Sequence, residues 1–428
     1  MFNNPDMACY MSPLRIAIIG AGPSGLILAS LFHRNQSPFT IYDLRSRPSS
    51  ALINIPSGSL DLHVESGQLA LSKCGLLEEF RSLTTECSED HIICDRFGDT
   101  KFETNSRDGE RPEISRNNLI ELLLSSIPED TIQWEHKVIS LSPNPTNPQQ
   151  QIITFQDCSS HICDLRIHWL TLTVPNITER IPEMAKMVGT GNFWALGGTR
   201  AILTQRSSMD SVRMYVTIHN EDVNHCHNVG LNSMDFEKMK EKLLGESGAF
   251  GDFGQRIKNL LAIGLEEEKT AGFLQMYMFA PDHAWEHKAN ATLVGDAAHL
   301  MTPFAGEGFN SAMLDALELA QGIIMAVRNE TSLSDAVREY EMTMFVRAKA
   351  NAEETVTNLK KIFENDAPKT VVEWFNSMGA GSDTTQYSVN NMRDQQDLIS
   401  TPSFMLAKDE RNFETRSQTH KIFANASF

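Results

Sequence analysis

Two glycine-rich segments carry residue types that can bind phosphates and sugars. The first, Gly20-Ala-Gly22-Pro-Ser24-Gly25, follows a short β-rich run and opens a stretch with helical spacing of apolar residues. Glycines permit a tight turn and close approach of the backbone to a pyrophosphate, and a helix start offers unpaired amides and partial positive charge. The segment predicts a dinucleotide site contacted by Gly20, Gly22, Ser24 and Gly25.

The next predicted strand supports this interpretation. Phe39–Asp43 is β-rich, and Asp43 ends it at the distance where a carboxylate can bond a ribose hydroxyl. Arg45, two residues further on, is predicted to face the adenine end of the same ligand. The order strand, glycine turn, helix and strand is that of the βαβ unit that opens a doubly wound sheet.

The second segment lies far along the chain. It contains Gly295-Asp-Ala-Ala-His299 and, shortly after, Pro303-Phe-Ala-Gly-Glu-Gly-Phe-Asn310. Asp296 can bind the hydroxyls of a sugar chain. The amides from Gly306 to Asn310, at the start of a long helical pattern, can stabilise negative charge.

These residues resemble a known family. The second segment looks like the second FAD signature of the class A flavoprotein monooxygenases, the para-hydroxybenzoate hydroxylase-like group. Ser57–His63 and Pro112–Leu119 further resemble the tetracycline-inactivating members of that group, in which the arginine at the place of Arg116 reaches the flavin. The resemblance covers roughly residues 15 to 363.

The resemblance implies a fold and a reaction. The fold is α/β, with a Rossmann-like FAD-binding domain of the GR2 type, a second and mostly antiparallel substrate sheet, and a long C-terminal helix. The implied cofactors are non-covalent FAD and NADPH as co-substrate. With O2, they would insert one oxygen atom into a small aromatic or polyketide-like molecule of secondary metabolism or detoxification.

Such chemistry belongs mainly to the cofactor, and no side chain stands out as an obligatory acid or base. The residues expected to contact FAD are Gly20, Gly22, Ser24, Gly25, Asp43, Arg45, Arg116, Asp296, Pro303, Gly306, Gly308, Phe309 and Asn310.

The predicted organisation has five parts. They are an N-terminal extension (1–14), the first part of the FAD-binding domain (15–167), the substrate sheet domain (168–285), the second part of the FAD-binding domain with C-terminal helices (286–376), and a polar tail (377–428). Ala291–Gly295 is predicted to be a buried strand. The candidates for lining an apolar cavity between the domains are Trp194, Met214, Tyr215, Met276 and Met278, although apolar alternation marks a buried face before it marks a pocket.

One family feature is missing. Relatives usually carry a third motif, with an Asp-Gly pair between small residues, after the strand that corresponds to Cys163–Ile167. This sequence continues instead with His168–Ile177 and contains no glycine before Gly189. The substrate domain is therefore predicted to be shortened at its start, and the contacts with FAD and NADPH that the family associates with this motif would be lost.

Composition limits the class of partner. A net charge of -18 and a pI near 5.2 argue against nucleic acid and anionic membranes, which require dense lysine and arginine. The seven cysteines are scattered without a Cys-x-x-Cys pair, which favours a reducing, cytoplasmic setting. Glycines and a proline interrupt the apolar stretch Leu14–Phe32, which argues against a membrane span or a targeting segment.

Two other functions stay open at this point. The missing motif would suit a flavin-fold protein without redox turnover, acting as a non-oxidative catalyst or a binding protein. A nicotinamide-dependent dehydrogenase without flavin would explain the first glycine segment but gives the second no role. A hydrolase has little support, since neither Gly-x-Ser-x-Gly nor His-Glu-x-x-His occurs.

Overall fold

The computed structural model describes residues 14–380, except for 50–54, 85–87, 105–110, 146, 156–163, 223, 232–235, 269–271 and 289. Almost all of the predicted N-terminal extension and the tail beyond Ala380 lie outside the described residues. So does Cys163, the first residue of the strand predicted before the missing motif.

The predicted βαβ unit is confirmed. Strand β1 (Ile16–Ile19) leads through the glycine turn into helix α1 (Pro23–Arg34), which returns to strand β2 (Phe39–Tyr42). β1 and β2 are parallel, and the short β7 (Ile132–Gln133) extends this small sheet beyond β2.

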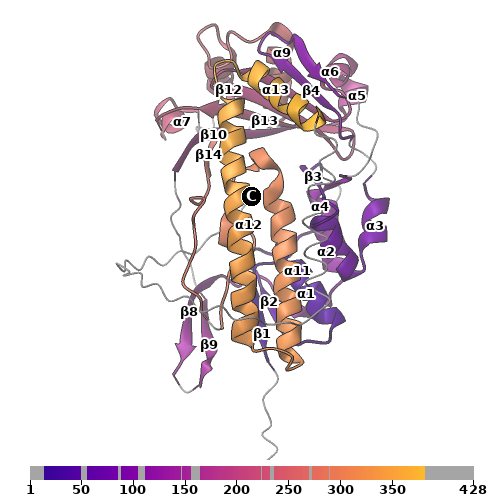
Figure 1. Ribbon diagram of the computed structural model, residues 1–428. Helices are drawn as coiled ribbons and strands as arrows, with labels where there is room; N and C mark the ends of the chain where they lie inside the picture. The colour runs from indigo at the N-terminus through magenta and orange to yellow at the C-terminus, as the bar shows by residue number, and fades with distance from the viewer. Residues whose placement is uncertain are drawn as a thin grey trace, which may run out of the picture.

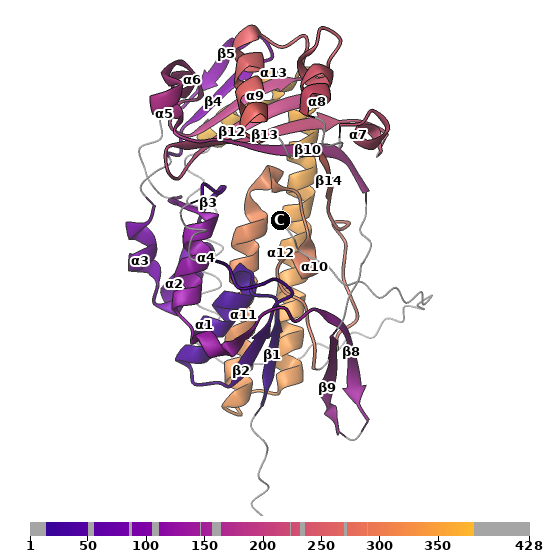
Figure 2. The same ribbon diagram turned by 180° about the vertical axis from the view of Figure 1, so that it is seen from behind.

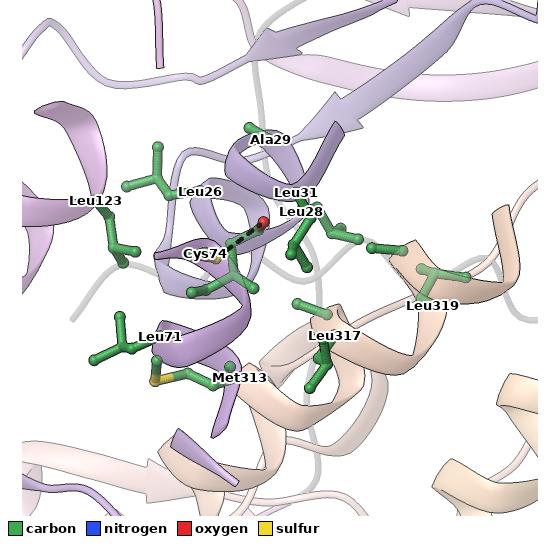
Figure 3. Close-up of a cluster of buried hydrophobic side chains, with 14 of the residues drawn as sticks. Leu26, Leu28, Ala29, Leu31, Leu71, Cys74, Leu123, Met313, Leu317 and Leu319 are labelled. Carbon is green, nitrogen blue, oxygen red and sulfur yellow. Dashed lines mark hydrogen bonds between the residues drawn. The ribbon is translucent and has the colours of Figure 1, made fainter. Parts of the chain in front are cut away.

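Helices surround α1 and bury its apolar side chains. They are α2 (Gly67–Cys74), α4 (Arg116–Ser125) and α11 (Glu307–Val327). Figure 3 shows the core in which leucines of α1 meet Leu71 of α2 and Met313 of α11. The 30-residue helix α12 (Leu333–Ile362) packs along α11 and extends toward the second sheet (Figure 1).

The second sheet is mostly antiparallel, as predicted. Its strand order is β14-β10-β13-β12-β11-β4-β5, and only the β4–β11 pair is parallel. The strands are β4 (His91–Asp95), β5 (Thr100–Glu103), β10 (Asp164–Val174), β11 (Asn192–Gly197), β12 (Arg200–Ser207), β13 (Ser211–His219) and β14 (Leu274–Tyr277). Thus β4 and β5, which lie within 15–167, pair into this sheet.

The two faces of this sheet differ. The alternating residues Val212, Met214, Val216 and Ile218 of β13 are buried against the helices on the outer face. Those helices include α6 (Pro182–Val188), α8 (Phe236–Leu244) and α9 (Gln255–Glu267). The other face looks toward the βαβ unit (Figure 2).

Smaller elements complete the chain. They are β3 (Ser59–Asp61) paired with β6 (Glu113–Ser115), the hairpin β8 (Val138–Asn144) and β9 (Asn147–Phe155), and the helices α3 (Leu77–Ser82), α5 (Ile177–Arg180), α7 (His225–Asn228), α10 (Asp296–His299) and α13 (Ala367–Ala380). None of the helices in the described ranges is long and apolar enough to cross a membrane.

The prediction of a buried strand at Ala291–Gly295 was wrong. Only an isolated bridge between Lys288 and Ala291 forms there, and the following residues are irregular. The cause is side-chain anchoring to the long helices. Thr292 donates to Glu341 of α12, and the Gly295 amide donates to Asp315 of α11, so the segment follows these helices rather than a neighbouring strand.

Candidate active site

A large cleft separates the βαβ unit from the inner face of the seven-stranded sheet. Its volume is about 3040 Å³, several times the few hundred Å³ of an ordinary small-ligand pocket. Twelve of the thirteen residues predicted to contact FAD line it, the exception being Asn310. The fold therefore brings the two glycine-rich segments, 270 residues apart, to one cavity.

The first glycine segment is built for close approach from the cleft. A methyl group added at Gly25 would lie 2.0 Å from the Gly20 carbonyl oxygen, so this glycine lets α1 pack on the turn. A methyl group at Gly22 would meet no protein atom within 4 Å. No side chain caps α1, and its first turn contains no acidic residue. Unpaired amides thus face the cleft where a phosphate could bind.

Asp43 holds this turn in place. Its carboxylate accepts hydrogen bonds from the Ala21 amide at 2.7 Å and from the Arg45 guanidinium at 2.8 and 2.9 Å. Burial acts to raise the pKa of Asp43, but the bonds from Arg45 and Ala21 outweigh it and hold the pKa below its ordinary value. Asp43 is therefore a carboxylate, and Arg45 lies folded against it at the cleft wall.

The second segment touches the first. Gly295 has a φ of +62°, and a methyl group there would lie 2.7 Å from the Ser24 hydroxyl oxygen. Only glycine tolerates both this conformation and this approach. Asp296 follows directly, with its side chain reachable from the cleft yet surrounded by protein. Burial raises the pKa of Asp296, and the charges of His299 and Arg116 oppose this only in part.

His299 anchors the second segment. Its Nε2 lies 2.5 Å from Asp315 on α11, and Asp315 also accepts a hydrogen bond from Arg347 of α12 at 2.7 Å. Arg347 is held in turn by Glu318. Burial acts to raise the pKa of Asp315, but the bonds and charges of His299 and Arg347 keep it below its ordinary value. The histidine of the motif thus fixes the backbone and does not face the cleft.

The start of α11 also opens onto the cleft. Pro303 begins a short 3-10 turn, and Gly306 ends it with a φ of +73° that turns the chain into the helix. Gly306, Gly308 and Phe309 line the cleft. Asn310 is fully buried instead. Its side chain bonds the Asp61 carbonyl and the His63 amide, so it connects α11 to β3 and does not line the cleft.

Beside this helix start lies a cluster of titratable groups that the sequence did not reveal. His63 is buried, with Nε2 3.1 Å from Asp61 and Nδ1 3.5 Å from Glu307. Burial acts to lower the pKa of His63, but Asp61 and Glu307 outweigh it and raise the pKa. Burial also raises the pKa of Glu307. The cluster places a proton-binding group at the mouth of the α11 amides.

The comparisons with known proteins agree with this arrangement. The model of the FAD binding domain family matches residues 286–357. The monooxygenase asqM of Emericella nidulans is 32% identical over 430 residues, covering 83% of this chain and 97% of its own. The monooxygenase penA of Penicillium thymicola is 32% identical over 413 residues, covering 81% and 95%. The chain belongs to the class A family of FAD-dependent monooxygenases.

Solved structures share the fold of this flavin monooxygenase. HpxO of Klebsiella pneumoniae, complexed with FAD and uric acid, superposes with a TM-score of 0.66 at 16% identity, covering 89% of this chain and 96% of its own. The tetracycline destructase Tet(51) superposes with a TM-score of 0.61 at 15% identity, covering 92% and 100%.

The sheet side of the cleft is aromatic. Trp194, Tyr215 and Met276 line it, as predicted. Met214 and Met278 do not, because both side chains are buried and Met214 faces the outer helices. The sequence analysis missed Trp169, whose ring centroid lies 4.6 Å from that of Tyr215. Alternation could have found it, since odd-numbered residues of β10 and β13 share one face.

Helix α13 supplies a further wall that the sequence analysis did not anticipate. The Phe375 ring contacts those of Trp194 and His91, with centroid distances of 5.7 and 5.1 Å. Trp374 lines the cleft beside it. The local sequence does not show which side of α13 meets the sheet. Its 14 residues include two adjacent aromatic side chains, and several orientations of the helix could bury them.

The parallel sheet of this monooxygenase ends at β1. The amides of Ile16 and Gly20 bond β2, so those of Ala17 and Ile19 point to the opposite edge. Within the described part of the chain, no strand pairs with that edge, and Ile19 is 49% exposed. The alignment with asqM spans 430 positions, but it includes only 83% of the 428 residues of this chain. The remaining aligned positions are gaps in this chain, so part of the relative has no counterpart here.

Proposed function

We propose that this flavin monooxygenase uses NAD(P)H to insert one oxygen atom into a small aromatic or polyketide-like molecule of secondary metabolism or detoxification, in a cytoplasmic setting. The observation that carries the proposal is the shared cleft. One wall carries glycine turns and helix starts suited to a dinucleotide, and the facing wall is an aromatic sheet suited to a planar substrate. The fungal relatives asqM and penA support the reaction type.

The residues fit FAD along its length. The α1 amides beyond Gly22 would bind the pyrophosphate, Asp43 a ribose hydroxyl, and Asp296 the hydroxyls of the sugar chain. Arg116, exposed in the cleft at the start of α4, would reach the flavin ring. FAD, when bound, supplies the electron transfer and the activation of O2.

The chain's own groups would orient and shield the reactants. The amides at the start of α11 would stabilise negative charge at the electron-rich edge of the ring, because the helix end carries partial positive charge. The aromatic side chains of the sheet and of α13 would exclude water and hold the substrate plane parallel to the ring. His63 would hold a proton beside Glu307 at this end of the cleft.

A direct experiment tests the proposal. The protein is loaded with FAD, its visible spectrum is recorded, and NADPH oxidation is followed under air with phenolic and polyketide substrates. Substrate-stimulated NADPH loss and a product heavier by one oxygen atom, labelled when 18O2 is used, are the expected results. Loss of FAD on gel filtration would overturn the assignment of the cleft.

The open edge of β1 favours a second candidate, a protein that holds FAD without NAD(P)H-driven turnover. We infer that the part of asqM without a counterpart in this chain includes the third motif, whose loss the sequence predicts. Under this candidate, FAD binds fully but NADPH oxidation stays at the rate of free FAD with every substrate. A chimera that carries the asqM segment between Phe155 and Asp164, the ends of β9 and β10, would then gain NADPH oxidation.

A further inference from the structure

A serine, a histidine and a glutamate form a hydrogen-bonded chain where helix α12 begins. The Nδ1 atom of His287 lies 2.6 Å from the Glu341 carboxylate, and its Nε2 atom lies 3.1 Å from the Ser334 hydroxyl. Ser334 and Glu341 are about two turns apart on α12, so both side chains project from the same side of this helix. They are 47 and 54 residues from His287 in the sequence, and no local motif therefore marks the arrangement.

Glu341 is the fixed end of this chain of hydrogen bonds. Its side chain is only 3% exposed. The Trp285 indole and the Thr292 hydroxyl donate to its other oxygen, at 3.0 and 2.7 Å. Three donors thus converge on one buried side chain, and they hold its carboxylate in a single orientation toward the imidazole of His287.

The position of this carboxylate assigns the tautomer of His287. A carboxylate only accepts hydrogen bonds, so the Nδ1 atom of His287 carries a proton and donates to Glu341. A neutral imidazole has one N–H group, which leaves Nε2 with a lone pair that accepts from the Ser334 hydroxyl. The three side chains therefore have the order of a nucleophile, a general base and a group that orients the base.

The start of α12 provides donors next to the Ser334 hydroxyl. The first helical hydrogen bond runs from the Ala336 amide to the Ser332 carbonyl, and the Ser332 hydroxyl caps the Asp335 amide. The amides of Leu333 and Ser334 precede these bonds and have no acceptor within the helix. Amides at a helix start stabilise negative charge, including that of the oxyanion formed when a serine attacks an acyl carbon.

Apolar side chains beside the serine indicate the kind of acyl group that would fit. Leu333 and Val337 flank Ser334 on α12 and line the cleft. Helix α11 packs against this part of α12, since a methyl group added at Gly322 would lie 3.3 Å from an α12 side chain, and Ile323 lines the cleft as well. This aliphatic end of the cleft suits a short apolar acyl chain better than a charged one.

We propose that Ser334 and His287, with Glu341 positioning the imidazole, form a second catalytic site that hydrolyses esters of short apolar acids. The Ser334 oxygen attacks the acyl carbon and its proton passes to Nε2 of His287. The bond between the acyl carbon and the alcohol oxygen then breaks as this proton moves to the departing alcohol.

Water completes the proposed cycle. Its oxygen attacks the acyl carbon of the acyl-serine while one of its protons passes to Nε2 of His287. The bond between the acyl carbon and the Ser334 oxygen breaks, the proton returns to the serine, and the acid leaves. Hydrolysis involves no oxidation or reduction, so this site does not depend on the proposed monooxygenase reaction.

Covalent labelling tests the serine directly. The FAD-loaded protein is treated with a fluorophosphonate probe, and the modified peptide is identified by mass spectrometry. The label should be on Ser334, and labelling should be about a hundredfold or more slower in His287→Gln, which keeps the serine but removes the base. A label on another residue, or equally fast labelling of His287→Gln, would overturn the proposal.

The positioning role of Glu341 is tested by the same reaction. In Glu341→Gln the new amide group can donate to Nδ1 of His287, which places the imidazole proton on Nε2 and removes the acceptor of the Ser334 hydroxyl. Labelling should then be about a hundredfold slower in a variant that circular dichroism shows to be folded. Unchanged labelling in this folded variant would overturn the role of Glu341.

Turnover is measured with p-nitrophenyl butyrate in the absence of NADPH. Ser334→Ala, purified in the same way, should hydrolyse this ester about a hundredfold or more slowly than the unmodified protein. Ser82→Ala is the matched control and should keep the full rate, because Ser82 is an exposed helix serine whose hydroxyl bonds the Glu79 carbonyl instead of an imidazole. Equal rates in Ser334→Ala and the unmodified protein would overturn the proposal. NADPH oxidation is measured separately, so the two proposed reactions fail in different experiments.

Discussion

The imidazole of His299 lies 2.5 Å from the carboxylate of Asp315, and this contact fastens the second glycine-rich segment to helix α11. Asp315 is fully buried and also bonds Arg347 and the Gly295 amide. One carboxylate thus joins the turn before Asp296 to the two longest helices. The position of Asp296 in the cleft depends on groups that do not touch the cleft.

Removing that carboxylate should loosen the fold and the cofactor site together. Asp315→Asn leaves His299 and Arg347 without their shared counter-charge, and breaking a buried ion pair costs about 3 kcal/mol of unfolding free energy. Urea unfolding measures the loss, and FAD affinity should fall with it. Glu318→Gln is the control, because its carboxylate is 29% exposed and its pair with Arg347 should be worth less than about 1 kcal/mol. Equal losses in the two variants would contradict the central place of Asp315.

Two glycines of the first turn should respond differently to alanine. In Gly25→Ala the new methyl group would lie 2.0 Å from a backbone oxygen, so α1 must move away from the turn and the protein should lose about 2 kcal/mol or more. In Gly22→Ala the methyl group meets open space, so stability should change by less than about 0.5 kcal/mol while FAD affinity falls about tenfold or more. Thermal unfolding of the FAD-free protein and fluorescence titration with FAD separate the two effects. Unchanged FAD affinity in Gly22→Ala would place the pyrophosphate elsewhere.

The roles of Asp43 in the turn and at the ribose can be separated by two substitutions. Asp43→Asn keeps an oxygen that can accept from the Ala21 amide, whereas Asp43→Ala removes every acceptor. Both should weaken FAD binding about tenfold, since a carboxylate bond to a hydroxyl is lost. Only the alanine variant should lose about 1 to 2 kcal/mol of unfolding free energy in the absence of FAD. If Asp43→Asn binds FAD as tightly as the unmodified protein, the carboxylate serves the turn alone.

The sequence predicted the elements whose signals are local. The glycine spacing at Gly20–Gly25 and the long apolar periods of α11 and α12 specify a turn and two helices without reference to the rest of the chain. The same holds for β13, where the buried face of Val212 to Ile218 was visible as alternation. From these elements and the resemblance, the fold class and the glycine-rich side of the cleft followed.

The parts that escaped prediction depend on long-range contacts. The segment from Ala291 has the composition of a strand. Hydrogen bonds to Glu341 and Asp315, on helices distant in sequence, hold it in an irregular conformation along those helices. Asn310 occupies the position of a cofactor ligand in the motif. Its side-chain amide instead bonds the carbonyl of Asp61 in β3 and the backbone amide of His63 just after that strand. Trp169 joins the aromatic wall of the cleft because β10 and β13 are neighbours, which sequence spacing does not reveal.

The stability supplied by His63 should depend on pH. Asp61 and Glu307 raise the pKa of this buried histidine in the folded protein, despite the opposing effect of burial. A raised folded-state pKa stabilises the protein fully below the ordinary histidine pKa of about 6.5, and this contribution disappears as pH rises through the folded-state value. His63→Gln should therefore lose more unfolding free energy at pH 6 than at pH 9, because the contribution of the protonated imidazole falls as the pH rises. Urea unfolding of the two proteins at both pH values measures this difference. His33→Gln, on the exposed side of α1 and without an ion pair to a described residue, is the surface control and is measured in the same way. A larger loss for His63→Gln at pH 9 would show that the histidine stabilises the fold as a neutral packing group rather than as a cation between two carboxylates.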